Sequence, residues 1–578
     1  MRKLLFPLIL LVSVPFLLPS CSGDNADTAS LVAKGGKKYG GDFRFMSAEK
    51  ITSIFPTHSA DLYSSRVVTQ IYEPLLRIDP ATLKAVPCIA ESFTVNDDAM
   101  VYTFKIRKGV KFHDDACFGG GTRELTADDV KFSLDLACSG LEDNQISYLL
   151  VEKVKGATEF QAKSKNSVPK EGVSGIKVID DNTVEITLKE PFSGLEYVLT
   201  HVGLGISPRE AFDKYGKEVG KHPVGTGPFK LESFTDEKIV LARNPHYWDK
   251  DEFGNQLPFM DKVEITYAKN KRSELMAFRN QEIDLVLELP VEEIDHILGT
   301  LKEAQEGKNV RHKVESEQSM SMMYIAMACD SDEFSDERVR KAFNLAIDRK
   351  AIVDDKLEGE GWPALNGFVP SIGNYPSDKV KGYKYDPTQA KALMAAAGYK
   401  DGKGFPALDF YVNTVEGSGI HKACSAIAEQ IKANLGVTLN VQLCTMDERK
   451  NAITSGKAKI WREGWIADYP DAENFLALFY AGNISNNATM VNTFKFKSDE
   501  FDKLFLKALS ETNPEKRTEL LVQCDQMVID KAAVMPVMTD DHVVMVNARI
   551  KNFEANPLEA IFLRDVFIKE PKPVTNEE

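Results

Sequence analysis

The 578-residue chain is predicted to adopt an α/β fold with mixed or parallel β-sheets. In the second half of the chain, apolar side chains recur at helical spacing and are followed by runs that alternate with a period of two residues. Hydrophobic residues make up 43% of the chain and charged residues 27%, which is typical of a globular protein. The length corresponds to about three to five folding units or two large lobes.

The amino terminus has the organisation of a secretion signal. Arg2 and Lys3 precede an apolar run over Leu4–Leu18. Two prolines interrupt this run, and it is too short to span a bilayer comfortably, which favours a signal peptide over residues 1–20.

Residues 18–21, Leu-Pro-Ser-Cys, resemble a bacterial lipobox, although the proline is a departure from the usual pattern. The resemblance implies cleavage before Cys21, lipidation of its thiol and anchoring to a bacterial membrane, in the periplasm or at the cell surface. The alternative is an ordinary secretion signal with a chance cysteine. Small and polar residues over 21–40 predict a flexible tether.

Charge and motif content exclude several classes of function. The formal net charge of −15 argues against a nucleic-acid partner, which would need clustered Lys and Arg. No G-x-S-x-G, H-E-x-x-H or Walker motif is present, so neither an enzyme nor a cofactor is predicted. The nine histidines form no metal-ligand pair, and 113–115 (His-Asp-Asp) is interpreted as a strand-end loop rather than a metal site.

Seven cysteines follow Cys21, and none of them forms a C-x-x-C pair. A zinc ribbon or a thioredoxin-type motif is therefore not expected, and the odd number leaves at least one thiol unpaired. These cysteines are Cys88, Cys117, Cys138, Cys329, Cys424, Cys444 and Cys524.

The first half of the chain is predicted to contain strands separated by a helix and by turns. Residues 101–107 alternate apolar and polar side chains, as a half-buried strand does. Thr126 is placed to cap a helix with two acidic residues in its first turn. Another strand covers 184–188, and the turn at 224–229 leads into strands that end at Arg243.

The second half follows a charged run at 307–314 and has stronger helix signals. Pro after an N-cap and Gly after the last apolar position mark the helix ends. The expected elements are a helix capped by Ser335, a helix from Asp386 to Gly398, a helix over 420–434, a strand over 437–443, a helix over 515–531 and an apolar run over 534–546.

Short segments in a fixed order also resemble one known family, the family 5 extracellular solute-binding proteins. This family contains the peptide-, dipeptide- and nickel-binding components of ABC importers. Each segment alone is weak, whereas the ordered set is specific and runs from about Gly41 to the carboxyl terminus. The segments are 71–76 (IYEPLL), 89–93 (IAESF), 102–113, 125–130, 223–229 (PVGTGPF), 243–248 (RNPHYW), 339–349, 383–387 and 464–471 (GWIADYPD).

The resemblance implies a two-lobed clamp of the periplasmic-binding-protein type II kind, with mixed β-sheets. A discontinuous lobe I is expected to carry an inserted subdomain, and two crossover strands are expected to form a hinge. Ligand would be buried by lobe closure, without covalent chemistry. The expected ranges are 41–64, 180–310 and 537–578 for lobe I, 65–179 for the subdomain and 311–536 for lobe II.

Asp468 matches the family position whose carboxylate holds the α-amino group of a bound peptide. A buried ammonium must be paired, because its desolvation is otherwise prohibitive. The alternative is that Asp468 is a turn residue. Asp471 is interpreted as the N-cap of the following helix.

Three further residues of this stretch are candidates for ligand binding. Arg462 occupies a place where some oligopeptide binders put an arginine for peptide carboxylates, the alternative being a solvated side chain. Trp465 matches an aromatic residue beside the amine site and could instead pack in the core, and Tyr469 is a weaker candidate. Glu73 and Arg77 are interpreted as structural.

The resemblance implies a monomeric, lipid-anchored receptor that delivers short peptides to an ABC permease in the membrane. Other ligands remain open, since relatives take nickel chelates or oligosaccharides. An exported hydrolase, and a surface adhesin or chaperone, are the alternatives from other classes.

Overall fold

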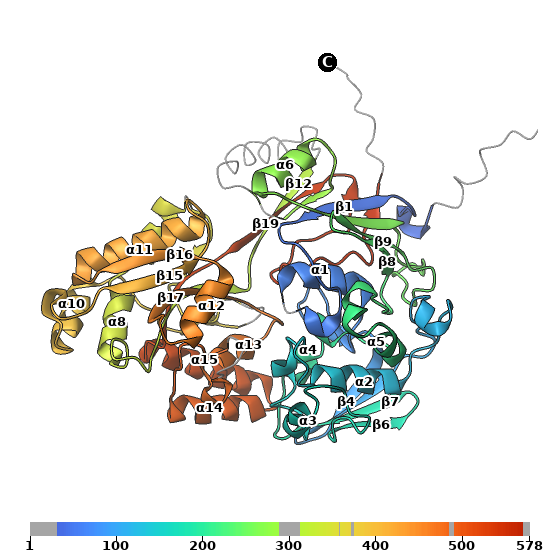
Figure 1. Cartoon of the computed structure of the whole chain (residues 1–578), viewed down its shortest axis with the longest axis horizontal. Coiled ribbons are helices and arrows are strands. Elements are labelled where there is room, and N and C mark those ends of the chain that lie inside the picture. The colour runs from blue at the N-terminus through green and yellow to red at the C-terminus, as the bar shows by residue number, and fades with distance from the viewer. Residues whose placement is uncertain are drawn as a thin grey trace, which may run out of the picture.

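The computed structural model describes residues 32–59, 61–287, 289, 312–357, 359–371, 375–484 and 491–569. The predicted signal peptide and Cys21 lie outside these ranges. Figure 1 shows two α/β lobes, one carrying β1, β8 and β9 and the other carrying β15, β16 and β17, with a smaller α/β unit around α2 below the first. None of the described helices combines the length and the apolar character needed to cross a bilayer.

The first lobe is built on a seven-stranded mixed sheet in the order β12-β19-β11-β1-β10-β9-β8. β1 runs parallel to β10 and β11, whereas the other pairs are antiparallel. A buried cluster that includes Phe43, Phe45 and Val263 packs this sheet against α1 (Leu62–Ile71). The strands are β1 (Asp42–Ser47), β8 (Phe229–Phe234), β9 (Lys238–Arg243), β10 (Lys262–Tyr267), β11 (Leu285–Val286), β12 (His312–Gln318) and β19 (Asp541–Asn547).

The second lobe is built on a six-stranded mixed sheet in the order β14-β18-β13-β17-β15-β16. All seven residues of β13 are buried, and the six from Met322 to Met327 alternate between two hydrophobic clusters, so both faces of the sheet are covered. The strands are β13 (Ser321–Met327), β14 (Trp362–Pro363), β15 (Leu408–Asn413), β16 (Leu439–Cys444), β17 (Ile460–Ile466) and β18 (Val534–Thr539). The main helices are α8 (Glu337–Leu345), α10 (Pro387–Ala396), α11 (Gly419–Leu435), α12 (Met446–Thr454), α13 (Ala472–Leu476), α14 (Asp499–Ser510) and α15 (Pro514–Asp530).

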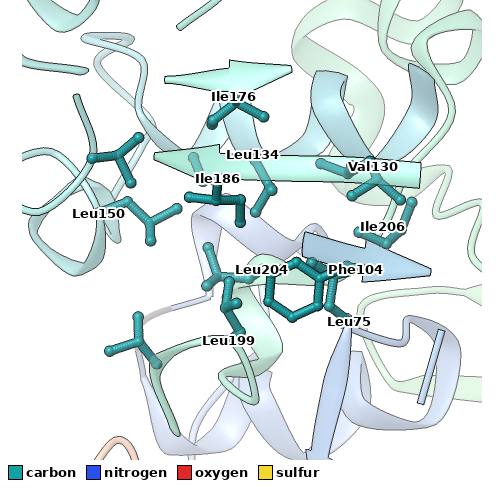
Figure 2. Close-up of a cluster of buried hydrophobic side chains, with 14 of the residues drawn as sticks. Leu75, Phe104, Val130, Leu134, Leu150, Ile176, Ile186, Leu199, Leu204 and Ile206 are labelled. Atoms are coloured by element: carbon teal, nitrogen blue, oxygen red, sulfur yellow. The ribbon is translucent and has the colours of Figure 1, made fainter. Parts of the chain in front are cut away.

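A four-stranded antiparallel sheet in the order β4-β5-β7-β6 forms the inserted subdomain together with α2 (Ala127–Ala137) and α3 (Ala157–Lys163). Figure 2 shows Phe104 from β5, Ile186 from β7 and Leu134 from α2 gathered in its core. The strands are β4 (Ala90–Val95), β5 (Val101–Ile106), β6 (Ile176–Asp180) and β7 (Thr183–Thr187). β7 thus belongs to this sheet, although its residues fall in a range expected for lobe I.

Shorter elements connect these layers. They are β2 (Leu76–Ile78), β3 (Ala85–Pro87), α4 (Leu195–Val198), α5 (Arg209–Tyr215), α6 (Lys271–Arg279), α9 (Arg349–Ala351), β20 (Ile550–Lys551) and β21 (Phe567–Ile568).

Two short crossings connect the large sheets. β12 of the first sheet continues into β13 of the second through Ser319 and Met320, and β18 returns to β19 through Asp540. The crossings lie side by side, since the Ser319 amide donates to the Asp540 carbonyl at 2.9 Å. The expected start of lobe II at residue 311 precedes β12, whose partner β19 lies in the first sheet.

Residues 32–40 pack on the first lobe, although the sequence places them in a flexible tether. A 3-10 helix covers Lys34–Gly36, and Val32 bridges Lys38. The Lys37 ammonium pairs with Asp251 at 3.1 Å and with Glu252 at 3.0 Å. Burial between these partners holds the segment on the lobe, because an unpaired buried ammonium would be costly.

The helix ends largely follow the sequence signals. A capping box joins Thr126 to α2, Asp386 caps α10, and Gly436 ends α11 in the left-handed region at φ 73°. The cap of α8 is Asp336 rather than Ser335, because the Asp336 carboxylate accepts from the Arg338 amide. All seven described cysteines are free thiols.

Candidate ligand-binding site

A cavity of about 1020 Å³ lies between the lobes. The first lobe contributes residues of α1 and of 72–88, the subdomain contributes 142–148, and the second lobe contributes Met446, Lys450 and 464–468. The carboxyl-terminal segment 558–565 completes the wall. This volume lies at the upper end of the roughly 300–1,000 Å³ of small-molecule sites, so the cavity has room for a ligand of several residues.

Asp468 lies in this cavity, two residues after β17 ends. Its Oδ2 accepts hydrogen bonds from the Tyr148 hydroxyl at 3.0 Å and from Asn474 Nδ2 at 3.1 Å. The side chain is only 15% exposed. The carboxylate is thus held from both sides of the cleft, by the subdomain and by its own lobe.

Asn474, on α13, fixes the geometry of the loop that carries Asp468. Its Oδ1 accepts from the Asp468 amide at 3.1 Å and from Trp465 Nε1 at 2.8 Å. Asp471 caps this helix as expected, accepting from the Glu473 amide and pairing with Arg517 at 2.8 Å. The helix therefore positions both the carboxylate and the indole ring.

The other oxygen of Asp468 faces a neutral histidine. His201 Nε2 lies 3.9 Å from Asp468 Oδ1, which is too long for a hydrogen bond. His201 Nδ1 accepts from the Gly203 amide at 3.0 Å, so the neutral ring carries its proton on Nε2. Burial lowers the pKa of His201, and the Asp468 charge opposes this only in part.

In the described part of the chain, no lysine or arginine lies within 4 Å of the Asp468 carboxylate. Tyr148 also remains a neutral donor, because burial and then the Asp468 charge raise its pKa well above the usual value. A carboxylate in a largely buried site without a cationic partner favours a positively charged ligand group.

The four residues predicted for ligand binding separate into two pairs. Asp468 and Trp465 line the cavity, whereas Arg462 and Tyr469 are not among its lining residues. The guanidinium of Arg462 lies over Gly464, where an added Cβ would be 3.1 Å from Arg462 NH2. Tyr469 is buried in the hydrophobic cluster of the subdomain and donates its hydroxyl to Glu473 Oε2 at 2.5 Å.

The lobes touch next to this site. Ser193, next to Phe192 of the subdomain's hydrophobic cluster, donates its amide to the Leu509 carbonyl at 3.2 Å and its hydroxyl to the Glu511 carbonyl at 2.9 Å. Lys153 lies 4.0 Å from Glu473. Together with the Tyr148 contact, these interactions join the subdomain side to the second lobe.

Glu73 lines another part of the cavity but is fully engaged by the first lobe. It accepts from Thr226 Oγ1 at 2.8 Å, Tyr247 Oη at 2.8 Å and Trp248 Nε1 at 2.9 Å. Burial raises its pKa, against these hydrogen bonds. The contacts agree with a structural role for Glu73.

The residues that present Asp468 are the ones that sequence reasoning missed. Tyr148 and His201 belong to distant segments and carry no local motif, so no sequence signal marks them. Asn474 was detectable in principle as a polar residue inside an apolar helix that directly follows the Asp468 segment. In the described residues no group of three metal-ligating side chains gathers, and His113 Nε2 lies 3.0 Å from the Gly227 carbonyl instead.

Comparison with known proteins identifies the family. The family model for bacterial extracellular solute-binding proteins, family 5 middle, matches residues 84–487. Heme-binding protein A of Haemophilus influenzae is 29% identical over 562 residues, covering 95% of this chain and 96% of that protein. Glutathione-binding protein GsiB of Salmonella choleraesuis is 27% identical over 512 residues, covering 87% of this chain and 89% of that protein.

Solved structures share the fold. The periplasmic binding protein DppA from Helicobacter pylori, in complex with peptide STSA, has a TM-score of 0.75 at 24% identity and covers 92% of this chain and 99% of its own. OppA of Haemophilus influenzae, in complex with RPPGFSPFR, has a TM-score of 0.74 at 23% identity, with coverage of 92% and 99%. The predicted two-lobed clamp is thereby confirmed, and these are binding proteins rather than enzymes. The chain belongs to the family 5 bacterial extracellular solute-binding proteins.

Proposed function

We propose that this protein is the lipid-anchored binding component of an ABC importer and that it captures short peptides by closure of its lobes. The observation that carries the proposal is the Asp468 carboxylate, which lies in the cavity between the lobes without a cationic side-chain partner among the described residues. The α-ammonium group of a peptide is the ligand group that would pair with it.

The free lone pairs of Asp468 favour this pairing. Tyr148 and Asn474 both bind Oδ2, whereas in the described structure Oδ1 meets only the neutral His201 at 3.9 Å. An ammonium group at Oδ1 would form a short charge-assisted hydrogen bond, about twice as strong as a neutral one. Trp465 next to it would contact the first side chain of the peptide.

The names of the two relatives differ in whether they support an amine-bearing ligand. Glutathione, named for the GsiB relatives, is a tripeptide with a free α-amino group. Heme, named for the Haemophilus influenzae relative, has no amine, so Asp468 does not favour it. A nickel chelate or an oligosaccharide would likewise leave the carboxylate unpaired.

Closure would be a rotation about the two crossings at 319–320 and 540. The crossings are short and adjacent, which suits a hinge whose few residues absorb the backbone change. In the structure the lobes touch through Tyr148, Ser193 and Lys153, and an opening motion would break these contacts.

The anchor is proposed at Cys21, and the membrane partner is proposed to be the importer's permease. Intact mass and peptide mapping of protein from the native host test the anchor, because a lipidated Cys21 would be the first residue of the mature chain. An unmodified amino terminus, or cleavage at another residue, would contradict the anchor without affecting the peptide site.

Calorimetry with Ala-Ala-Ala and its N-acetyl form tests the binding function. We expect micromolar affinity for the free amine, at least tenfold weaker binding of the acetylated peptide, and at least a tenfold loss in Asp468→Asn. Asp115→Asn is the matched control, because Asp115 also accepts from a tyrosine hydroxyl (Tyr215, 2.7 Å) and from an amide but does not line the cavity.

Equal affinity of Asp468→Asn and the unaltered protein would overturn the amine site. Recovery of cleaved peptide after incubation would point to the hydrolase alternative. Mass spectrometry of molecules that co-purify with the protein then names the natural ligand.

A further inference from the structure

Two arginines in the cavity wall share one aspartate. Arg77 NH1 donates to Asp249 Oδ2 at 2.9 Å, and Arg564 NH1 donates to the same oxygen at 2.8 Å. Arg77 lies on β2 and Arg564 near the carboxyl terminus, so the fold brings the two together from opposite ends of the chain. Both arginines line the cavity, whereas Asp249 does not.

The two guanidinium groups keep most of their donors unused. A guanidinium has five N–H donors, and the described structure gives each of these arginines one side-chain hydrogen bond, the one to Asp249. Their side chains are 29% and 31% exposed. Asp249 thus orients both groups and leaves free N–H donors at the cavity wall.

Neighbouring charges do not consume these donors. Glu73 accepts from Thr226, Tyr247 and Trp248 rather than from Arg77. Asp79 accepts from Thr82, and Asp565 approaches Arg564 only to 4.0 Å.

Trp248 lies behind one member of the pair, Arg77. Its indole ring lies 6.0 Å from the Arg77 guanidinium carbon and 4.4 Å from that of Arg107, while its Nε1 donates to Glu73. The Arg77 guanidinium is therefore held between the Trp248 ring and the Asp249 carboxylate. Such fixed guanidinium groups match the two oxygens of a carboxylate.

Asp284 is also shared by two arginines, but this second group lies outside the cavity and therefore serves as a structural comparison. Asp284 accepts from Arg549 through both Nε and NH2 and from Arg44 through Nε, and none of these three residues lines the cavity. Arg44 and Arg549 each donate from Nε to Asp284. Arg77 and Arg564 instead each donate to Asp249 from the terminal NH1 alone.

We propose that Arg77 and Arg564 form a subsite that binds a carboxylate group of the ligand. This inference rests on the proposed peptide function and narrows it: the ligand carries both an ammonium group, bound by Asp468, and a carboxylate, bound by the arginine pair. Arg77 is then a specificity residue as well as a structural one. The carboxylate comes from the peptide's carboxyl terminus or from an acidic side chain.

Calorimetry with three free-amine peptides tests the subsite and separates these sources. Ala-Ala-Ala has a terminal carboxylate, Ala-Ala-Ala amide has none, and Ala-Asp-Ala amide has one in its side chain only. We expect the amide without a carboxylate to bind at least tenfold more weakly than Ala-Ala-Ala. Recovery of affinity in Ala-Asp-Ala amide would assign the subsite to side-chain carboxylates, and no recovery would assign it to the terminus.

Arg77→Gln and Arg564→Gln should each weaken binding of Ala-Ala-Ala at least tenfold while changing the affinity for its amide less than twofold. Arg564→Lys keeps the charge but loses the planar fork, so it should recover only part of the affinity. Arg549→Gln is the matched control and should leave the ratio of acid to amide unchanged. Thermal melts of each variant identify any loss of folding.

Equal binding of Ala-Ala-Ala and its amide by the unaltered protein would overturn the subsite and leave the amine site standing. The subsite would also be overturned if Arg77→Gln and Arg564→Gln both fold and still bind Ala-Ala-Ala at least tenfold more tightly than its amide. Failure of all three peptides to bind would instead overturn the peptide function, and the subsite with it.

Discussion

The Tyr148 hydroxyl donates a hydrogen bond to Asp468 across the cleft, and the two residues are 320 positions apart in the sequence. The same carboxylate that is placed to receive a ligand thus also joins the subdomain to the second lobe. If Asp468 binds the ligand as proposed, recognition and lobe contact would share one side chain, and binding would be coupled to closure at Asp468.

Tyr148→Phe should weaken peptide binding about tenfold or more. The closed form loses a hydrogen bond to a charged group, which contributes roughly 1.5–3 kcal/mol, and an open form would not contain it. Calorimetry with Ala-Ala-Ala measures the effect. Tyr215→Phe, which loses a hydroxyl bound to Asp115 outside the cavity, is the control, and unaltered affinity of Tyr148→Phe would contradict the coupling.

Trp465→Phe should abolish most of the change in tryptophan fluorescence on ligand binding. The chain has four tryptophans, and of these only Trp465 is among the residues that line the cavity. Titration of the emission spectrum with peptide measures the change. Trp362→Phe, at a residue that is 56% exposed and outside the cavity, should keep the signal. A full signal in Trp465→Phe would place the ligand elsewhere.

Stability should fall as the pH drops from about 6.5 toward 4. Burial lowers the pKa of His113 to about 4 and that of His542 to about 4, so both are neutral in the folded state. The unfolded chain binds protons first, near pH 6.5, and the folded state is therefore disfavoured progressively until the folded-state pKa is reached. Each histidine contributes at most about 3 kcal/mol over this window.

Urea unfolding at pH 7, 5.5 and 4.5 measures this dependence. His113→Asn should reduce the loss of unfolding free energy between pH 7 and 4.5, whatever its effect at pH 7. His246→Gln, at an exposed histidine, should leave that loss unchanged. An unchanged loss in His113→Asn would show that other groups control the acid response.

Glu73→Gln should destabilise the protein by about 1–3 kcal/mol, because an amide nitrogen cannot accept the hydrogen bonds that the carboxylate accepts. Tyr247 or Trp248 would be left with a buried, unpaired donor. Urea unfolding measures the loss, with Glu91→Gln at an exposed position as the control. Stability equal to that of the unaltered protein would show that the network rearranges without cost.

Local signals in the sequence were sufficient for most helix ends. Asp386 before a proline and Gly436 after an apolar stripe mark α10 and α11, because caps depend on neighbouring residues only. The cap of α8 was predicted one residue early, since Ser335 and Asp336 are both good caps and the backbone selects Asp336. The packing of residues 32–40 on the first lobe depends on distant partners such as Asp251, which no local pattern reveals.

The candidate site was predictable only on the strand that carries its motif. Trp465 on β17 and Asp468 just after it belong to one sequence segment, whereas Tyr148, His201 and Arg564 come from distant parts of the chain. Their placement depends on how sheets and lobes pack, which spacing along one chain does not encode. The sheet membership of β12 is a similar case, because it is set by pairing with β19 more than 200 residues later.

The clasp of Lys37 by Asp251 and Glu252 has a mechanical consequence. An anchor at the amino terminus, such as the proposed lipid at Cys21, would therefore act on the lobe with the seven-stranded sheet rather than on the lobe with the six-stranded sheet. The half with the six-stranded sheet would then be the moving half, joined to the stationary half through the backbone at 319–320 and 540. Fluorescence energy transfer between one dye on each lobe would therefore report the same single rotation in the membrane-anchored protein and in protein without an anchor.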